Sequence, residues 1–214
     1  MSAPPLVLDT LRIALAGTPL VELDVTVPPG EVLTVMGPSG SGKSTLLAAL
    51  VGLLDPAFEL TGRIRLGAED VTALPPERRR IGVLFQDPLL FPHLSVAGNL
   101  LFGLPSGGDR RTRRRRVEAA LADAGLAGFA PRDPATLSGG QQARVALLRV
   151  LLSEPRALLL DEPFAKLDAA LKDDIRRFVF ARVRERGLAT ILVTHDPADA
   201  AAAGGPVHAL AAHG

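Results

Sequence analysis

The alternation of apolar and polar residues predicts several β-strands. Residues 20–36 alternate on both sides of a Pro-Pro-Gly turn at 28–30, which is the pattern of two strands joined by a turn. The other predicted strands are short, and those with continuous apolar residues are typical of a buried parallel sheet. They lie at residues 62–67, 80–85, 156–161 and 189–194.

The middle of the chain has helical spacing instead. From about residue 95 to residue 152 it is rich in Ala and Leu, with a break of Gly, Ser and Pro at 105–108. Another helix is predicted at roughly 168–186, between two of the apolar strands. We therefore expect an α/β fold with a helical segment inserted between the strands.

The composition fits such a fold and narrows its chemistry. Of the 214 residues 47% are hydrophobic, enough for one large domain or a domain with an inserted subdomain. The net charge of +1 does not indicate bulk attraction to nucleic acid. The lack of cysteine excludes disulfides, thiolate metal sites and a cysteine nucleophile. Without a signal-peptide pattern or an apolar run that could span a bilayer, we expect a soluble chain.

A nucleotide site is predicted at GPSGSGKST, which begins at Gly37 after an apolar strand and runs into a helix. Gly40 and Gly42 let the backbone curl, so that its N–H groups point at phosphate oxygens. Lys43 is placed to reach the β- and γ-phosphates, and the Ser44 hydroxyl to bind Mg²⁺. A glycine-rich turn without a ligand is the alternative, but the full motif between strand and helix favours the nucleotide.

Polar residues follow four of the predicted strands. Gly37, Gln86, Asp161 and His195 all lie at or just beyond strand ends, and the carboxyl ends of parallel strands share one edge of a sheet. We interpret Asp161 as a Mg²⁺ ligand and Glu162 as the base that accepts a proton from the attacking water. Gln86 is expected to sense Mg²⁺ or that water, and His195 to hydrogen-bond the γ-phosphate. Each of these residues alone would fit an ordinary strand exit.

A second glycine-containing turn, Ser138-Gly139-Gly140-Gln141, precedes another helical segment. Ser138 and Gln141 have the spacing of a capping box. The turn would present free N–H groups to an anion but has no lysine, so local evidence fits an ordinary helix cap equally well. A similar N-cap role is predicted for Asp196, because Pro197 follows it.

Six ordered motifs resemble those of the ATP-binding cassette (ABC) proteins, the nucleotide-hydrolysing subunits of ABC transporters. The resemblance covers nearly the whole chain. The motifs are GPSGSGKST (Walker A), LFQD (Q-loop), LSGGQ (signature), ALLLDEP (Walker B), FAKLD (D-loop) and VTHD (switch histidine). It implies a P-loop NTPase (RecA-like) core with a mainly parallel sheet, N-terminal antiparallel strands and an inserted helical subdomain. The implied single domain has its core at about 1–87 and 155–214, and the subdomain at about 88–154.

The resemblance also implies roles and partners. Glu162, His195, Gln86 and Lys43 would be catalytic, and Ser44, Gln86 and Asp161 would hold Mg²⁺. The ATP-binding residues would be Gly37, Pro38, Ser39, Gly40, Ser41, Gly42, Lys43, Ser44, Thr45, Ser138, Gly139, Gly140, Gln141 and Asp168. The signature turn would act on ATP held by a second subunit in a head-to-tail dimer, expected to be a homodimer. Expected partners are integral membrane permease subunits and a solute-binding protein, with the chain on the cytoplasmic face of the inner membrane and no nucleic acid bound.

Two positions depart from the family pattern. The aromatic residue that usually stacks on adenine is missing, and Ala14 and Leu15 stand near its place. Because base stacking contributes roughly 1–3 kcal/mol in nucleic-acid sites, we expect weaker ATP binding and poor discrimination against GTP. Lys166 also stands where the D-loop usually has a small or polar residue.

Two further segments bear on partners. The stretch after the Q-loop is similar to importer-type cassettes, where it forms a cleft for the permease, although packing in the subdomain core is the alternative. Its apolar residues are Phe85, Leu89, Leu90, Phe91 and Leu94. The run RRTRRRR at 110–116 opens a helix with an apolar face. It fits a solvated face, lipid headgroups or a permease loop better than DNA, because the basic charge is local.

Two other functions compete with transport. Repair and translation ATPases of the same family carry a long coiled coil or tandem cassettes, and neither feature occurs in this sequence. A P-loop kinase would leave LSGGQ unexplained. The sequence therefore favours an ATP-hydrolysing subunit that powers solute import through a separate permease.

Overall fold

The chain divides into two compact units, each built from separate segments of the sequence. The first unit comprises Met1–Val83, Arg156–Glu162 and Phe180–Gly214, and the second comprises Leu84–Pro155 and Pro163–Val179. In this computed structural model, residues 3–211 are described, with the backbone alone for Ala170. No helix in that range is long and apolar enough to cross a membrane.

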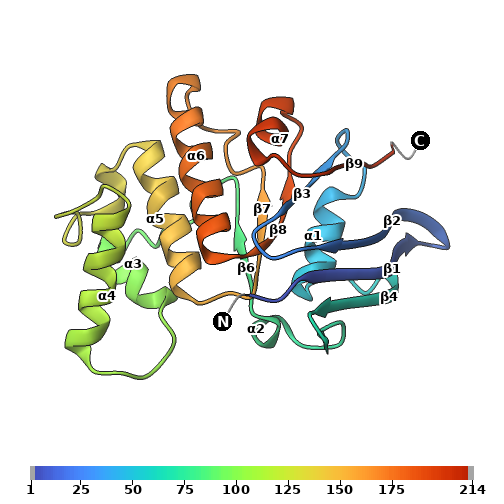
Figure 1. Cartoon of the computed structure of the whole chain (residues 1–214), viewed down its shortest axis with the longest axis horizontal. Coiled ribbons are helices and arrows are strands. Elements are labelled where there is room, and N and C mark those ends of the chain that lie inside the picture. Colours follow the sequence, from blue (N-terminus) through green and yellow to red (C-terminus); the bar gives the residue numbers. More distant parts are fainter. Residues whose placement is uncertain (1–2, 212–214) are drawn as a thin grey trace. The chain divides into compact units, whose positions relative to one another are not determined.

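An antiparallel sheet in the first unit has the strand order β2-β1-β4-β5 (Figure 1). Its strands are β1 (Leu6–Leu15), β2 (Thr18–Val27), β4 (Phe58–Leu66) and β5 (Glu69–Asp70). The sequence pattern missed β1, because a bulge between Leu8 and Leu11 adds one residue and breaks the alternation. Thr10 has φ 45° at this bulge, and a Cβ at Gly62 would lie 2.3 Å from its carbonyl oxygen.

A second sheet in the same unit has the order β6-β7-β8-β3-β9. Its strands are β3 (Val32–Met36), β6 (Ile81–Leu84), β7 (Ala157–Asp161), β8 (Ala189–Val193) and β9 (Val207–Ala209). Strands β7, β8, β3 and β9 pair in parallel, and every residue of β8 is buried. The predicted α/β fold with a mainly parallel sheet and N-terminal antiparallel strands is confirmed. Of the five strands in this sheet, β9 alone was not predicted, because three residues are too few to show a pattern.

Three short helices complete the first unit: α1 (Lys43–Val51), α2 (Pro76–Arg79) and α7 (Pro197–Ala203). Arg79 is 5% exposed and fixes the end of α1, where its guanidinium donates to the carbonyls of Ala49 at 2.7 Å and Leu50 at 2.9 Å. A cation at this end also complements the helix dipole. One apolar core joins α1 to strands of both sheets, so the helix that follows the P-loop is held along its length.

The second unit is helical. It contains α3 (Val96–Gly103), α4 (Arg110–Asp123), the 3₁₀ turn η1 (Pro134–Thr136) and α5 (Gly139–Leu152). Helix α6 (Ala169–Arg186) begins in this unit and ends in the first. Helix α3 packs against α4 and α5 around buried Val117, Leu121, Val145 and Leu148 (Figure 1). The predicted break at 105–108 separates α3 from α4.

Candidate functional site

The P-loop links the end of β3 to the start of α1. Gly42 has φ 88°, and a Cβ there would lie 2.8 Å from Cγ2 of Val21. At Gly37 a Cβ would lie 2.5 Å from Oγ of Ser41. The loop therefore needs glycine at both positions: at Gly42 for the left-handed backbone, and at Gly37 for close packing against Ser41. Helix α1 has no side-chain cap, which leaves its first N–H groups available to an anion.

Two polar groups of the loop fit a phosphate ligand. The Lys43 ammonium donates to the carbonyls of Gly37 at 2.7 Å and Pro38 at 2.6 Å, so it lies folded over the loop with one of its three donors left. The Ser41 hydroxyl is fully buried and has no hydrogen-bond partner within the described structure. An unpaired buried hydroxyl is costly, so a bound phosphate oxygen would satisfy a group that the protein leaves open.

Three side chains meet beside this loop. Asp161 ends β7, Glu162 follows it, and His195 lies two residues beyond β8. Nδ1 of His195 is 3.1 Å from Oε1 of Glu162. The sequence predicted both residues but not their direct contact. The Glu162 N–H donates to the carbonyl of Val193 at 2.9 Å, which ties the two strand ends together.

The backbone of Glu162 is in the left-handed region, with φ 44°. For a residue with a Cβ this conformation costs roughly 1–2 kcal/mol. Such strain is concentrated at functional sites. The turn brings the Glu162 carboxylate to His195.

Burial raises the pKa of Asp161, and the charge of Glu162 raises it further, whereas Lys43 lowers it. Two carboxyl groups held this closely repel each other when both are ionised. A divalent cation between them and the P-loop would relieve that repulsion, and oxygen ligands such as carboxylates and the Ser44 hydroxyl suit Mg²⁺. The residues present therefore fit the ion that the sequence predicts.

A buried hydrogen bond lies behind His195. The Thr194 hydroxyl donates to Oδ2 of Asp199 at 2.7 Å, and both residues are almost fully buried. The same hydroxyl accepts from the N–H of Asp196 at 3.1 Å. These bonds hold the backbone on both sides of His195. Asp199 was missed because an acid in the first turn of a helix normally indicates only favourable dipole placement.

Helix α5 begins with the predicted capping box. The Ser138 N–H donates to Oε1 of Gln141 at 3.0 Å, and Ser138 Oγ accepts from the Gln141 N–H at 3.4 Å. Ser138 and Gly139 are exposed, whereas Gly140 is buried. The predicted N-cap at Asp196 is also confirmed, since Oδ1 accepts from the N–H of Ala198 at 2.9 Å.

Gln86 and Gly139 line one cavity of about 180 Å³ in the second unit. Lys166 lines it too and forms an ion pair with Asp87. This pair links the segment after β6, which carries Gln86, to the segment after β7, which carries Asp168. No local pattern in the sequence indicated this ion pair, because the two residues are far apart in the chain.

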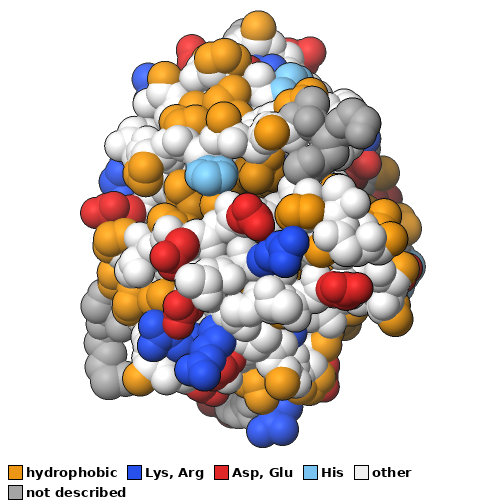
Figure 2. Space-filling view, turned by 90° about the vertical axis from the view of Figure 1, so that its right-hand side faces the viewer, with side chains coloured by type: hydrophobic (Ala, Val, Ile, Leu, Met, Phe, Trp, Pro, Cys, Tyr) orange, Lys and Arg blue, Asp and Glu red, His pale blue; other side chains and the backbone are white. Residues whose placement is uncertain are grey.

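The predicted site residues thus fall into two groups. The P-loop, Asp161, Glu162 and His195 belong to the first unit, and Gln86, the Ser138 turn and Asp168 belong to the second. Figure 2 shows acidic, basic and histidine side chains interspersed on one face of the molecule.

Comparisons with known proteins support the motif assignment. Residues 20–165 match the family described as ABC transporter. The uncharacterized ABC transporter ATP-binding protein YnjD of Escherichia coli (strain K12) is 50% identical over 180 residues, which cover 84% of this chain and 83% of that protein. The Fe(3+) ions import ATP-binding protein FbpC 1 of Rhizobium meliloti (strain 1021) is 45% identical over 87% of this chain.

Another similar relative is the putative 2-aminoethylphosphonate import ATP-binding protein PhnT of Salmonella typhimurium (strain LT2), which is 44% identical over 91% of this chain. The matched region spans 52% of FbpC 1 and 53% of PhnT, so the chain spans about half the length of these import proteins.

A solved structure shares the fold. The dimeric structure of MJ0796, a bacterial ABC transporter cassette, aligns with a TM-score of 0.75 and 29% identity, over 97% of this chain and 94% of that one. The matches in sequence and in structure cover most of the chain and agree with the family that the motifs resemble. The chain therefore belongs to the ABC transporter family, as one of its ATP-binding, ATP-hydrolysing proteins.

Proposed function

We propose that the chain powers solute import through a separate membrane permease, and that it works as a head-to-tail dimer. The contact between Glu162 and His195 beside a P-loop with open phosphate-binding groups carries the proposal. The names of FbpC 1 and PhnT support import, and the dimeric MJ0796 structure supports pairing. A homodimer, a solute-binding protein and a position on the cytoplasmic face of the inner membrane belong to the same proposal.

Binding in this scheme begins at the P-loop. The free N–H groups of α1 and the Ser41 hydroxyl receive phosphate oxygens, and Lys43 exchanges a loop carbonyl for the β- and γ-phosphates. Ser44, Asp161 and Gln86 would hold Mg²⁺, which neutralises phosphate charge when bound. The remaining P-loop residues, Pro38, Ser39, Gly40 and Thr45, shape the cradle.

Hydrolysis requires a base and an orienting partner. Glu162 accepts the proton as a water oxygen bonds to the γ-phosphorus, and the bond from that phosphorus to the β-γ bridging oxygen breaks. His195 fixes the Glu162 carboxylate through Nδ1 and leaves Nε2 for the γ-phosphate. The backbone bonds at Thr194 keep His195 in this position.

The second nucleotide contact comes from the partner subunit. Ser138, Gly139, Gly140 and Gln141 offer N–H groups and a hydroxyl but no cation, and Asp168 would link the sites across the dimer. Because the γ-phosphate would join two surfaces, hydrolysis and phosphate release remove the contacts that favour closure. The dimer then opens and moves the permease.

The dependence of ATPase rate on protein concentration tests this scheme. The rate per chain should rise steeply with concentration as dimers form, because one chain alone lacks half of each site. Full activity per chain at concentrations where light scattering shows only monomers would overturn the proposal.

A further inference from the structure

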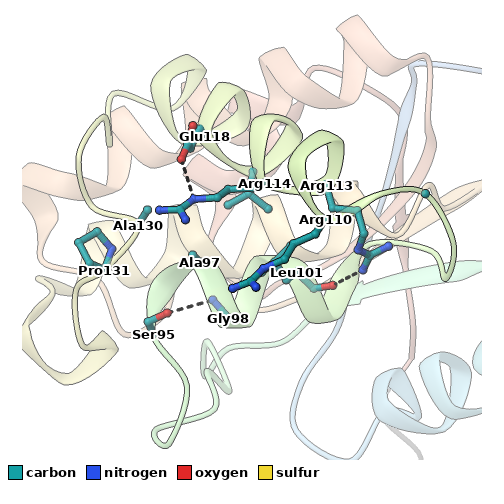
Figure 3. A pocket seen from close by; sticks show the side chains of 12 residues that line it. Ser95, Ala97, Gly98, Leu101, Arg110, Arg113, Arg114, Glu118, Ala130 and Pro131 are labelled. Atoms are coloured by element: carbon teal, nitrogen blue, oxygen red, sulfur yellow. Dashed lines mark hydrogen bonds and ion pairs between the residues drawn. The ribbon is translucent and has the colours of Figure 1, made fainter.

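A cavity of about 600 Å³ lies between α3 and α4 in the second unit, and none of the residues that line it is assigned to ATP (Figure 3). Its apolar lining comes from Ala97, Leu101, Val117, Ala130 and Pro131. Arg110, Arg113 and Arg114 line the same cavity, and Glu118 is its acidic residue. Figure 3 shows the side chain of Arg110 extending toward Gly98 of α3 and that of Arg114 toward Ala130. The size is that of a small-molecule site, and the local charge is positive.

The three arginines differ in the contacts that their side chains make. Arg113 holds the loop before α4, where its guanidinium donates to the carbonyls of Leu101 at 3.0 Å and Gly107 at 3.1 Å. Arg114 pairs with Glu118 at 3.1 Å. The guanidinium of Arg110 makes no hydrogen bond or ion pair with any residue in the described range 3–211. One guanidinium with all its donors free thus lies beside an apolar cavity.

These charges destabilise the helix that carries them. Helix α4 begins at Arg110, where the helix dipole is positive and a cation is unfavourable. Arg110 lies four residues from Arg114, and Arg111 four residues from Arg115, so two like-charged pairs repel along the helix. An anion in the cavity would relieve this repulsion.

An exposed aromatic residue of α3 follows one of the residues that line the cavity, although it is not itself part of the lining. Phe102 of α3 is 67% exposed and follows Leu101, whose carbonyl accepts from Arg113. Its ring stacks edge-on against Phe91, with the centroids 4.7 Å apart. Cations next to an exposed aromatic ring are the combination found at surfaces that lie on a membrane.

We propose that this arginine pocket binds the phosphate headgroup of an anionic lipid at the membrane surface. Arg110 and Arg114 contact the phosphate, because a guanidinium donates two parallel hydrogen bonds to such oxygens. The apolar lining takes the glycerol carbons, and Phe102 enters the interface. An acidic peptide would use the arginines but would not account for the exposed ring, and nucleic acid would need a basic stripe rather than one lined cavity.

Vesicle flotation with the full chain tests this site. We expect binding to vesicles of phosphatidylcholine mixed with phosphatidylglycerol, weakened by salt, and little binding to phosphatidylcholine alone. Arg110→Gln should weaken binding about fivefold, and Arg110→Gln with Arg114→Gln about 25-fold. Phe102→Ser should weaken it as well.

Arg116→Gln is the matched control. It removes the same charge from the same helix, but Arg116 already pairs with Glu154 at 2.7 Å and does not line the pocket. It should leave vesicle binding nearly unchanged, and all variants should stay folded at the assay temperature and keep the wild-type ATPase rate. If Arg110→Gln and Arg116→Gln lost vesicle binding equally, the vesicles would be attracting the net charge of the chain alone. That result would overturn the proposed site.

Two other outcomes would also overturn it. One is no binding to anionic vesicles. The other is Arg110-dependent binding of an acidic peptide or duplex DNA with none to vesicles. Because the assay needs no ATP, its failure leaves the proposed transport function standing.

Discussion

Two helices of the chain begin at glycine-containing turns, α1 after Gly42 and α5 after Ser138. Helix α1 has no side-chain cap, and Lys43 follows its turn. Helix α5 is capped by the Ser138 hydroxyl through a long bond of 3.4 Å and has no cation in its first turn. The first turn thus has open donors beside catalytic groups, whereas the second has a weakly held cap that a phosphate oxygen could displace. The contrast is what we expect if the two turns serve different halves of a nucleotide site, as proposed.

The largest effect on ATPase turnover is expected from Glu162, beside the P-loop. Glu162→Gln keeps the size and contacts of the side chain but removes the base, so turnover should fall about 10²- to 10⁴-fold with ATP binding retained. Stopped-flow nucleotide binding and steady-state phosphate release measure the two properties separately. An unchanged rate would show that another group accepts the proton.

The second prediction concerns the Ser138 turn at the start of α5. Ser138→Arg puts a bulky side chain at an exposed turn, so it should leave ATP binding by the monomer intact and abolish ATP-dependent dimerisation of the variant with itself, where both sites contain the arginine. Fluorescent nucleotide titration and analytical ultracentrifugation with ATP measure these two properties. Loss of binding in the monomer would contradict the assignment of Ser138 to the partner's nucleotide. Ser153→Arg, at the opposite end of α5, is the control.

The third prediction adds a contact that the sequence lacks. Ala14 is buried and Leu15 is 41% exposed at the end of β1, so Leu15 is the position from which a ring could reach the base. Leu15→Tyr should tighten ATP binding by roughly 1–3 kcal/mol. Calorimetry with ATP and GTP checks both affinity and selectivity. If Leu15→Tyr changed neither the affinity for ATP nor the selectivity over GTP, Leu15 would not lie near the adenine.

The fourth prediction follows from the raised pKa of Asp161. Because burial and Glu162 favour the protonated form, the folded state binds that proton more tightly than the unfolded chain does. Stability of the nucleotide-free protein therefore falls as pH rises from the ordinary Asp pKa of 3.8 through the raised value. At neutral pH, Asp161→Asn should raise the melting temperature without nucleotide and lose protection by Mg²⁺ and ATP. A lower melting temperature would contradict this explanation.

The smallest effect is expected at the pair of Lys166 and Asp87. Their side chains are 55% and 56% exposed, so the pair should contribute only about 0.2–1 kcal/mol to the free energy of unfolding. A double-mutant cycle with Lys166→Ala and Asp87→Ala measures it. Strict additivity would show that the pair contributes nothing.

Local motifs and apolar periodicity predicted most of the fold. The buried strands β7 and β8 and the cap of α5 were visible because their signals lie within a few neighbouring residues. Strand β1 was missed where its bulge at Thr10 breaks the alternation. The Thr194–Asp199 bond, the Lys166–Asp87 pair and the direct contact of Glu162 with His195 arise only when the chain folds, so no local pattern encodes them.

The central claim is that each ATP site combines the P-loop and base of one chain with the Ser138 turn of its partner. Mixing two inactive variants tests this claim most directly. Glu162→Gln lacks the base and Ser138→Arg lacks the turn, but a heterodimer of the two contains one site with an intact base facing an intact turn. The account predicts that an equal mixture regains ATPase activity in proportion to the mixed dimers that form, because each of them contains one complete site. A mixture that forms mixed dimers yet stays as inactive as its components would contradict it.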